Sequence, residues 1–233
     1  MLFETKDIIR EYKSGEGKLL ALNKVNVVIE EGEITTILGP SGSGKTTLLN
    51  NLSGLDKINS GEILFQGQDI AKFNQDKLTT YRRENTGFIF QNYNLVSTLT
   101  ARENVALGAY LSDNALDVDE IIKEVGLEEH GNKFPHQLSG GQQQRIAIAR
   151  VLVKNPKVIF CDEPTGALDE ESGRVVLQLL QNLNKKYKTS IIMVTHNPNI
   201  ANMSHKVIYF KNGKIDKVMN NESIVDAFSI DWS

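Results

Sequence analysis

The stretch "GPSGSGKTT", residues 39–47, decides the fold. Its portion from Gly39 to Thr46 fits the pattern G-x-x-x-x-G-K-[ST] without a mismatch. A β-branched, apolar run precedes it at 33–38, and a helical pattern over 44–53 overlaps its end. In this context the glycines let backbone N–H groups turn inward around phosphate oxygens, and the helix start contributes its dipole. The stretch therefore predicts a phosphate-binding loop between a buried strand and a helix, rather than an ordinary surface turn.

Individual side chains of this loop have expected roles in binding a nucleotide. The Lys45 ammonium is expected to reach the β- and γ-phosphates, and the Thr46 hydroxyl to bind Mg²⁺. The residues predicted to contact the phosphates are Gly39, Pro40, Ser41, Gly42, Ser43, Gly44, Lys45, Thr46 and Thr47.

Buried strands and helices alternate along the rest of the chain. Short β-branched or aromatic runs predict strands at 33–38, 87–90, 157–162, 190–195 and 206–210. Helical patterns fall at 44–53, 103–111, 117–126, 139–153 and 170–187. Because buried strands that alternate with helices are typical of a parallel sheet covered on both faces, we expect an α/β fold.

Two regions depart from this alternation. Three runs at 2–12, 24–32 and 61–70 are typical of an antiparallel β-layer. Residues 92–137 have no strand signal and are mostly helical in pattern. We therefore predict a single domain over residues 1–233. Its core covers 1–91 and 138–233, and a helical subdomain is inserted over 92–137. Near the end, Asn212-Gly213 between two β-type runs predicts a hairpin.

Composition limits the kind of protein. The net charge of −3 provides no basic footprint for a nucleic acid, and a single cysteine, Cys161, excludes an internal disulfide. The N-terminus carries acidic residues and no apolar segment of the kind a signal peptide has. The apolar runs are about four residues long, whereas a membrane helix needs roughly 20. If this chain acts at a membrane, we expect another protein to span it.

Two adjacent carboxylates follow a predicted buried strand. Asp162 and Glu163 end the strand 157–162, and Pro164 stops it. On an ordinary protein surface such a pair would not indicate a function. Here it follows a buried strand, and ligands of parallel sheets bind at the carboxyl ends of the strands. One acid on Mg²⁺ and one on the attacking water would give the pair two roles. We assign Asp162 to the metal side and Glu163 to general-base catalysis.

Three further residues are candidates by their position. His196 follows the strand 190–195 and is expected at the γ-phosphate, although a lone histidine is otherwise structural or solvated. Gln91 ends the strand 87–90, where its amide oxygen can touch Mg²⁺ or the attacking water. Tyr12, in a glycine-containing stretch predicted as a turn, offers a ring on which adenine can stack. His130, His136 and His205 are expected to be structural or on the surface.

A second glycine-rich stretch, "LSGGQ" at 138–142, has no catalytic side chain. Ser139 followed by Gln142 fits a capped helix start, which explains the pattern without any ligand. Gly140-Gly141 also exposes backbone amides at a helix N-terminus, where anions bind. Because the first loop already holds phosphates, this second site could cap the γ-phosphate bound by another subunit of a two-fold dimer.

Together these motifs resemble those of the ATP-binding cassette (ABC) family, the nucleotide-binding domains of ABC transporters. The resemblance covers about residues 2–220, and the motifs follow the family's order. They are "GPSGSGKTT" (39–47), Gln91, "LSGGQ" (138–142), "VIFCDEP" (158–164), "GALD" (166–169) and His196. One departure is Cys161, where a small or aliphatic residue is more usual; we expect it to pack as a small hydrophobe.

The resemblance implies how the motifs would act. ATP would be sandwiched between the phosphate loop of one subunit and Leu138, Ser139, Gly140, Gly141 and Gln142 of the other. Ser139 and Gly141 would contact the γ-phosphate, and Tyr12 would stack on adenine. Gly166, Ala167, Leu168 and Asp169 would lie on the dimer seam. Mg²⁺ would be held by Thr46, Gln91 and Asp162, partly through water.

The resemblance is strongest to a subgroup that includes ATPases of macrolide exporters, lipoprotein-release systems and bacitracin-type peptide-resistance transporters. It implies an ATP-bound homodimer at the cytoplasmic face of the membrane. A separate permease, with or without a membrane-fusion or adaptor protein, would dock near Gln91 and 92–137, and the complex would export its substrate. A cell-division ATPase that regulates a membrane partner is the alternative. Chromosome and ribosome ATPases of the family fit less well, because the chain has one cassette and no sustained heptads between 47 and 138.

Overall fold

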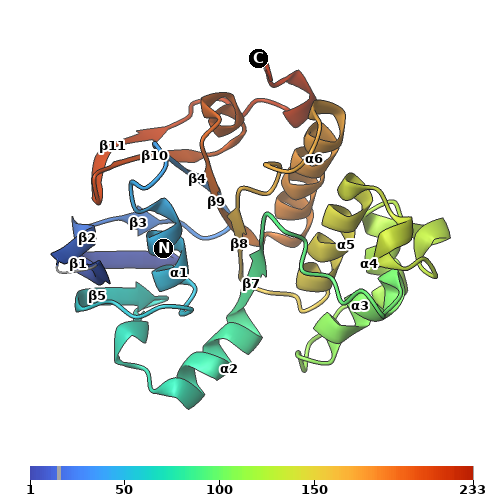
Figure 1. Ribbon diagram of the computed structural model, residues 1–233, viewed down its shortest axis with the longest axis horizontal. Coiled ribbons are helices and arrows are strands. Elements are labelled where there is room, and N and C mark those ends of the chain that lie inside the picture. The colour runs from blue at the N-terminus through green and yellow to red at the C-terminus, as the bar shows by residue number, and fades with distance from the viewer. Residues whose placement is uncertain (15–16, 233) are drawn as a thin grey trace.

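The computed structural model describes residues 1–14 and 17–232, which form two sheets with helices around them (Figure 1). The six-stranded sheet has the order β11-β10-β4-β9-β8-β7, and β10, β4, β9, β8 and β7 run parallel. Its strands are β4 (Ile34–Leu38), β7 (Thr86–Ile89), β8 (Val158–Asp162), β9 (Ser190–Thr195), β10 (Lys206–Lys211) and β11 (Lys214–Asn220). The predicted α/β fold is confirmed.

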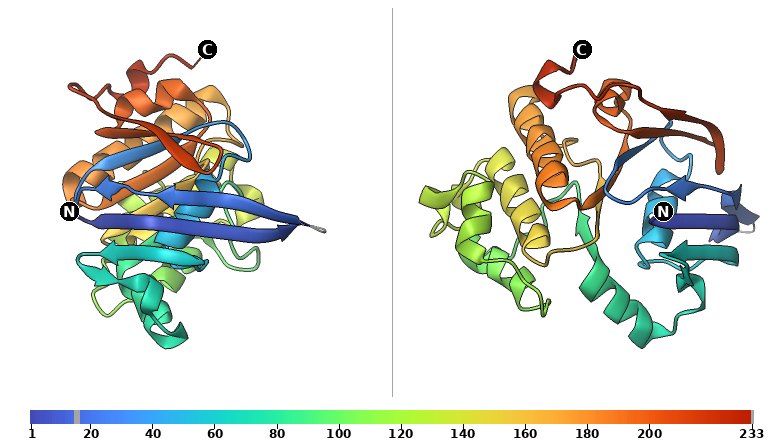
Figure 2. Two further views of the ribbon diagram at one scale, coloured as in Figure 1. Left: turned by 90° about the vertical axis from the view of Figure 1, so that its left-hand side faces the viewer. Right: turned by 180° about the vertical axis from the view of Figure 1, so that it is seen from behind.

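A second, antiparallel sheet carries the start of the chain. It consists of β1 (Phe3–Ser14), β2 (Gly17–Val25), β3 (Val28–Ile29), β5 (Ser60–Phe65) and β6 (Gln68–Asp69). It lies on one side of the six-stranded sheet, and the helices α5 (Gly140–Leu152) and α6 (Glu170–Tyr187) lie on the other (Figure 2). The expected antiparallel layer is therefore present.

Side chains of the central strands alternate between two cores. Along β8, Ile159 and Cys161 point into one core, whereas Val158 and Phe160 point into the other. Because both sets are buried, the sheet is covered on both faces, as the near-continuous apolar runs predict. Burial raises the pKa of the Cys161 thiol, so this residue packs as a small hydrophobe.

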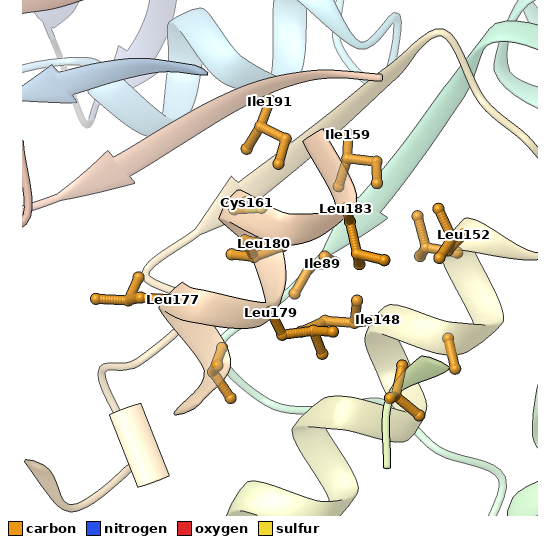
Figure 3. Packing of buried hydrophobic residues seen from close by; sticks show 14 of the residues in the cluster. Ile89, Ile148, Leu152, Ile159, Cys161, Leu177, Leu179, Leu180, Leu183 and Ile191 are labelled. Atoms are coloured by element: carbon orange, nitrogen blue, oxygen red, sulfur yellow. The ribbon is translucent and has the colours of Figure 1, made fainter. Parts of the chain in front are cut away.

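Helices fill the space beside the central sheet. They are α1 (Lys45–Leu52), α2 (Gln75–Asn85), α3 (Ala101–Ala109), α4 (Val118–Glu124), α5 (Gly140–Leu152) and α6 (Glu170–Tyr187). Leucines of α6 and apolar residues of α5 pack on one face of the sheet (Figure 3). On the other face, Leu48, Leu49 and Leu52 of α1 join the core shared with the antiparallel sheet.

One helix is absent from the sequence-based prediction. α2 buries only Leu78 and Tyr81, so its apolar periodicity is too weak to stand out. Its start is nevertheless fixed, because the Asn74 side chain accepts a hydrogen bond from the backbone N–H of Lys77.

The segment 92–137 contains α3 and α4 and short 3₁₀ turns, in line with its helical pattern. Both helices pack against α5, which lies next to α6 on the sheet. The division of the chain at 92 and 137 stays a prediction. Among the described residues no helix is long and apolar enough to cross a membrane.

The crossing of α3 and α5 depends on Gly108. A Cβ on this residue would lie 2.0 Å from the carbonyl oxygen of Arg150 and 2.7 Å from Cγ1 of Val153. Gly108→Ala is therefore expected to lower the free energy of unfolding by about 1–3 kcal/mol, measured by urea denaturation. Gly131→Ala is the matched control, because its Cβ would meet atoms no closer than 3.7 Å. Equal stability of the two variants would contradict this packing.

Candidate nucleotide-binding site

The carboxyl ends of four parallel strands meet at one edge of the six-stranded sheet. β4 leads into the loop 39–47, β8 ends at Asp162, β9 ends just before His196, and β7 ends two residues before Gln91. Together they border a cavity of about 750 Å³. The site residues on its wall are Tyr12, Ser41–Thr47, Gln91, Asp162, Glu163, Gly166 and His196. The cavity thus brings together side chains that are up to 184 residues apart, from Tyr12 to His196.

The phosphate loop is held tightly against its neighbours. Gly44, at the start of α1, has a φ of 107°, a backbone conformation that residues other than glycine rarely adopt. A Cβ here would also lie 2.3 Å from the carbonyl oxygen of Ala21 in β2. Only glycine fits at this position, so the loop can present its backbone N–H groups to an anion at the helix start.

The Lys45 side chain folds back onto the backbone of its own loop. Its Nζ donates to the carbonyl oxygens of Gly39 at 2.8 Å and Pro40 at 2.9 Å. Burial is the largest influence and lowers the pKa of Lys45, whereas the charges of Glu163 and Asp162 act in the opposite direction. An ammonium group has three donors, so one remains for a phosphate oxygen.

Thr46 and Asp162 lie together, as a shared metal site requires. The Thr46 hydroxyl donates to Oδ1 of Asp162 at 3.2 Å. Burial is the main reason that the pKa of Asp162 is raised; the hydrogen bond from Thr46 opposes it. Hydroxyl and carboxylate oxygens are the ligands that Mg²⁺ takes beside a nucleotide, so this pair fits the predicted ion.

Glu163 stands directly after β8 in a strained conformation. Its φ is 50°, in the left-handed region, and its backbone N–H donates to the carbonyl oxygen of Val194 at 3.0 Å. Its Oε1 lies 3.0 Å from Nδ1 of His196, which is largely exposed. Because a carboxylate only accepts hydrogen bonds, Nδ1 carries the proton of this bond. The geometry aims Glu163 at the cavity and leaves its second oxygen to accept a proton.

Gln91 lies at the edge of the cavity beside Gly166. Its Nε2 is 3.1 Å from the position that a Cβ of Gly166 would occupy. A predicted metal-side residue and a predicted dimer-seam residue are thus in contact, and both line the cavity.

Tyr12 lies in strand β1, where it pairs with Leu19 of β2, and not in a turn. The prediction of a turn around it is wrong, because the β1–β2 pairing extends past Tyr12 to Ser14. Residues 15–16 lie outside the described part of the chain. Tyr12 does line the cavity, as a base-stacking ring would.

Several lining residues are not predicted from the sequence. Leu19, Leu20 and Ala21 of β2 and the Asn212-Gly213 hairpin also border the cavity. The hairpin itself is confirmed, with φ values of 49° and 75° at its two residues. The local sequence pattern predicts the hairpin, but it does not indicate that the hairpin contacts the phosphate loop.

The second glycine-rich stretch, 138–142, which we call the signature, lies apart from this cavity. Ser139 caps α5, its backbone N–H donates to Oε1 of Gln142 at 2.9 Å, and the Gln142 N–H donates to Oγ of Ser139 at 3.3 Å. The predicted capping box is therefore present. Among the described residues, none from 138–142 borders the cavity.

The signature packs on the segment predicted for the dimer seam. Gly140 lies beside Leu168, and Gly141 lies beside Ser172, at the start of α6. Asp169 caps α6 by accepting from the N–H and the hydroxyl of Ser172, both at 2.9 Å, and these bonds lower its pKa. Residues 138–142 and 166–169, including Ala167, therefore lie close together in one subunit.

Gln144 is a further link that the sequence does not reveal. This side chain of α5 is fully buried, and its Nε2 donates to the carbonyl oxygen of Pro164 at 2.8 Å. Pro164 directly follows Glu163, so the helix that begins at the signature is tied to the turn that carries Glu163.

The chain was compared with protein families and with curated proteins. Residues 22–166 match the family described as ABC transporter. The chain is 44% identical to the ABC transporter ATP-binding protein MJ1508 of Methanocaldococcus jannaschii, over 94% of this chain and 100% of that protein. It is 46% identical to the macrolide export ATP-binding/permease protein MacB of Neisseria meningitidis, over 92% of this chain but 34% of that protein. The chain thus spans all of one relative and about a third of the other.

A solved structure has the same fold. It is the dimeric structure of a post-hydrolysis state of the ATP-binding cassette MJ0796, bound to ADP and Pi. It is 40% identical in sequence, superimposes with a TM-score of 0.86, and the match covers 96% of this chain and 100% of that one.

Proposed function

The chain belongs to the ABC transporter family, and from that membership we propose that it is the subunit that hydrolyses ATP to drive a separate membrane permease. One observation carries the proposal. The phosphate loop, Asp162, Glu163 and His196 meet in a single cavity at the carboxyl edge of the sheet. Phosphoryl transfer to water needs these groups: a phosphate cradle, a metal-side carboxylate and a base.

In this proposal ATP lies with its phosphates in the loop 39–47 and its base on Tyr12. Mg²⁺, when bound beside Thr46, Asp162 and Gln91, neutralises charge on the phosphates. Glu163 accepts a proton from the attacking water, whose oxygen forms the new bond to the γ-phosphorus. The bond from that phosphorus to the β–γ bridging oxygen breaks, and ADP leaves. His196 orients Glu163 and contacts the γ-phosphate.

We propose that two copies close around two ATP molecules. The signature 138–142 of one copy would cap the γ-phosphate held by the other, and 166–169 would lie on the seam. The position of the signature outside the cavity of its own chain supports this, because the start of α5 would then meet a phosphate held by another copy. The dimeric arrangement of the solved relative also supports it.

The permease would dock near Gln91 and the segment 92–137. In this region Phe90, Val96, Tyr110 and Leu111 are exposed apolar side chains, which favour a protein partner. The chain would then act at the cytoplasmic face of a membrane, and an adaptor protein could complete the complex. The exported substrate would be an antibiotic, a peptide or a lipid-linked molecule, and a relative named for macrolide export supports the first of these.

Isolation of the tagged Glu163→Gln protein from native membranes, with ATP and Mg²⁺, tests this function. The expected result is a stoichiometric integral-membrane partner, identified by mass spectrometry. Recovery of ribosomes, of DNA or of no membrane protein would contradict the transport proposal. A permease that moves no cargo in vesicles would favour regulation of a membrane partner instead.

A further inference from the structure

The side chains of Arg10, Tyr12 and Asp56 form a cluster at the proposed site for the adenine base. The Arg10 guanidinium donates to both carboxylate oxygens of Asp56, at 2.9 Å from Nε and 2.8 Å from Nη2. The Tyr12 hydroxyl donates to Oδ2 of the same carboxylate at 2.6 Å. The guanidinium carbon of Arg10 also lies 4.5 Å from the centre of the Tyr12 ring. The ring is therefore held at its hydroxyl and covered on one face.

The cluster is more rigid than an ordinary surface ion pair. The side chains of Arg10 and Asp56 are only 21% and 25% exposed, and their contact is bidentate. Isolated, flexible surface pairs contribute little, but a planar fork on a carboxylate adds geometric specificity. A cation over the face of an aromatic ring adds further attraction.

The anchor of the cluster belongs to the phosphate-loop unit. Asp56 lies four residues beyond the end of α1 at Leu52, and its backbone N–H donates to the carbonyl oxygen of Asn50 in that helix. Nearby, Oδ1 of Asn59 accepts from the backbone N–H of Glu11 at 2.8 Å. The helix that begins at the phosphate loop thus fixes, through the segment after it, the position of β1 around Tyr12.

Only one face of the Tyr12 ring is open to a ligand. Tyr12 borders the cavity, whereas Arg10 and Asp56 are not among the residues on its wall. The Arg10 guanidinium occupies one face of the ring, so the opposite face is the one left for a ligand. A planar base can stack there without moving the ring.

We propose that Arg10 and Asp56 are positioning residues for nucleotide binding, which hold Tyr12 as a preformed platform for the base at a fixed distance from the phosphate loop. The inference rests on the proposed function, since it takes the ligand to be a nucleotide. Neither residue touches the ligand. They restrict the conformational freedom of the Tyr12 ring before the ligand binds, so that less conformational entropy is lost on binding.

The test compares binding of ADP and of inorganic pyrophosphate by calorimetry, with the full chain. Pyrophosphate shares the phosphates of ADP but has no base, and neither probe has a γ-phosphate. Asp56→Ala and Arg10→Met are expected to raise the Kd for ADP about 5- to 10-fold, which lies within the range given by the loss of one aromatic contact. Their Kd for pyrophosphate is expected to stay within about two-fold of that of the native chain, because the phosphate loop is untouched.

Conservative variants and a matched ion pair serve as controls. Asp56→Asn keeps an oxygen that accepts from Tyr12 and should recover part of the ADP affinity, and Tyr12→Ala should lose at least as much as Asp56→Ala. Lys18→Ala breaks the exposed pair of Lys18 with Glu11 on the same ribbon and should change neither Kd.

The outcomes separate this inference from the proposed function. If Tyr12→Ala weakens ADP binding while Arg10→Met and Asp56→Ala do not, the platform role is wrong and nucleotide binding stands. Equal losses for ADP and pyrophosphate would mean a general disturbance of the fold, and would also overturn the platform. If the native chain binds neither ADP nor pyrophosphate, the proposed function itself fails.

Discussion

Glu163→Gln is expected to lower ATP turnover by about 10²- to 10⁴-fold, the range for loss of a general base. The substitution removes the basic carboxylate but keeps its size and one oxygen, so the contact with Nδ1 of His196 can remain. Binding should therefore survive while hydrolysis stops. Steady-state release of phosphate measures the turnover, and light scattering with ATP should detect a dimer that persists.

The control for this variant is the same substitution at an exposed position close by. Glu171→Gln, in the first turn of α6, removes one negative charge without touching the cavity. It should hydrolyse ATP at the native rate. Native turnover in Glu163→Gln would instead show that another group accepts the proton from water.

Ser139→Asp is expected to abolish ATP-dependent dimerisation and to lower turnover by about 100-fold or more. Aspartate caps a helix as well as serine does, so α5 should remain folded. Its charge, however, would face the γ-phosphate of the partner's ATP, and like charges across an interface cost several kcal/mol. Binding of ADP to the single chain should not change, because Ser139 lies outside its own cavity.

Ser139→Asn isolates the charge in this experiment. It is almost the same size as aspartate and also caps well, but it is neutral. It should retain more dimer and more turnover than Ser139→Asp. If the two variants behave alike, or if Ser139→Asp dimerises normally, the signature does not face a phosphate across the interface.

The sequence predicts the central site well because each of its motifs is local. A strand, a glycine-rich loop and a helix that follow one another specify the phosphate cradle within about 20 residues. Asp162 ends β8 and His196 directly follows β9, and these neighbouring parallel strands meet in register at their carboxyl ends. Their roles in binding and catalysis stay predictions, whereas their placement at one cavity is a property of the structure.

The parts that the sequence does not predict depend on distant or weak signals. Arg10 and Asp56 are 46 residues apart, and no periodicity marks them as a pair. Ala21 meets Gly44 because extra residues in β2 shift the β1–β2 register, which strand propensity does not reveal. α2 buries two side chains only, and Tyr12 continues a strand that the nearby glycines predict to have ended.

The central claim, that each ATP site is built from two copies, is tested most directly by mixing two defective chains. Lys45→Ala removes the phosphate-loop ammonium, and Ser139→Asp damages the signature. Neither chain alone should form an ATP-dependent dimer. A mixed dimer, however, holds one site with the intact Lys45 of one chain and the intact Ser139 of the other. The account predicts that ATP-dependent association, measured by light scattering, returns on mixing the chains one to one. A mixture that behaves as the sum of its two inactive components would contradict it.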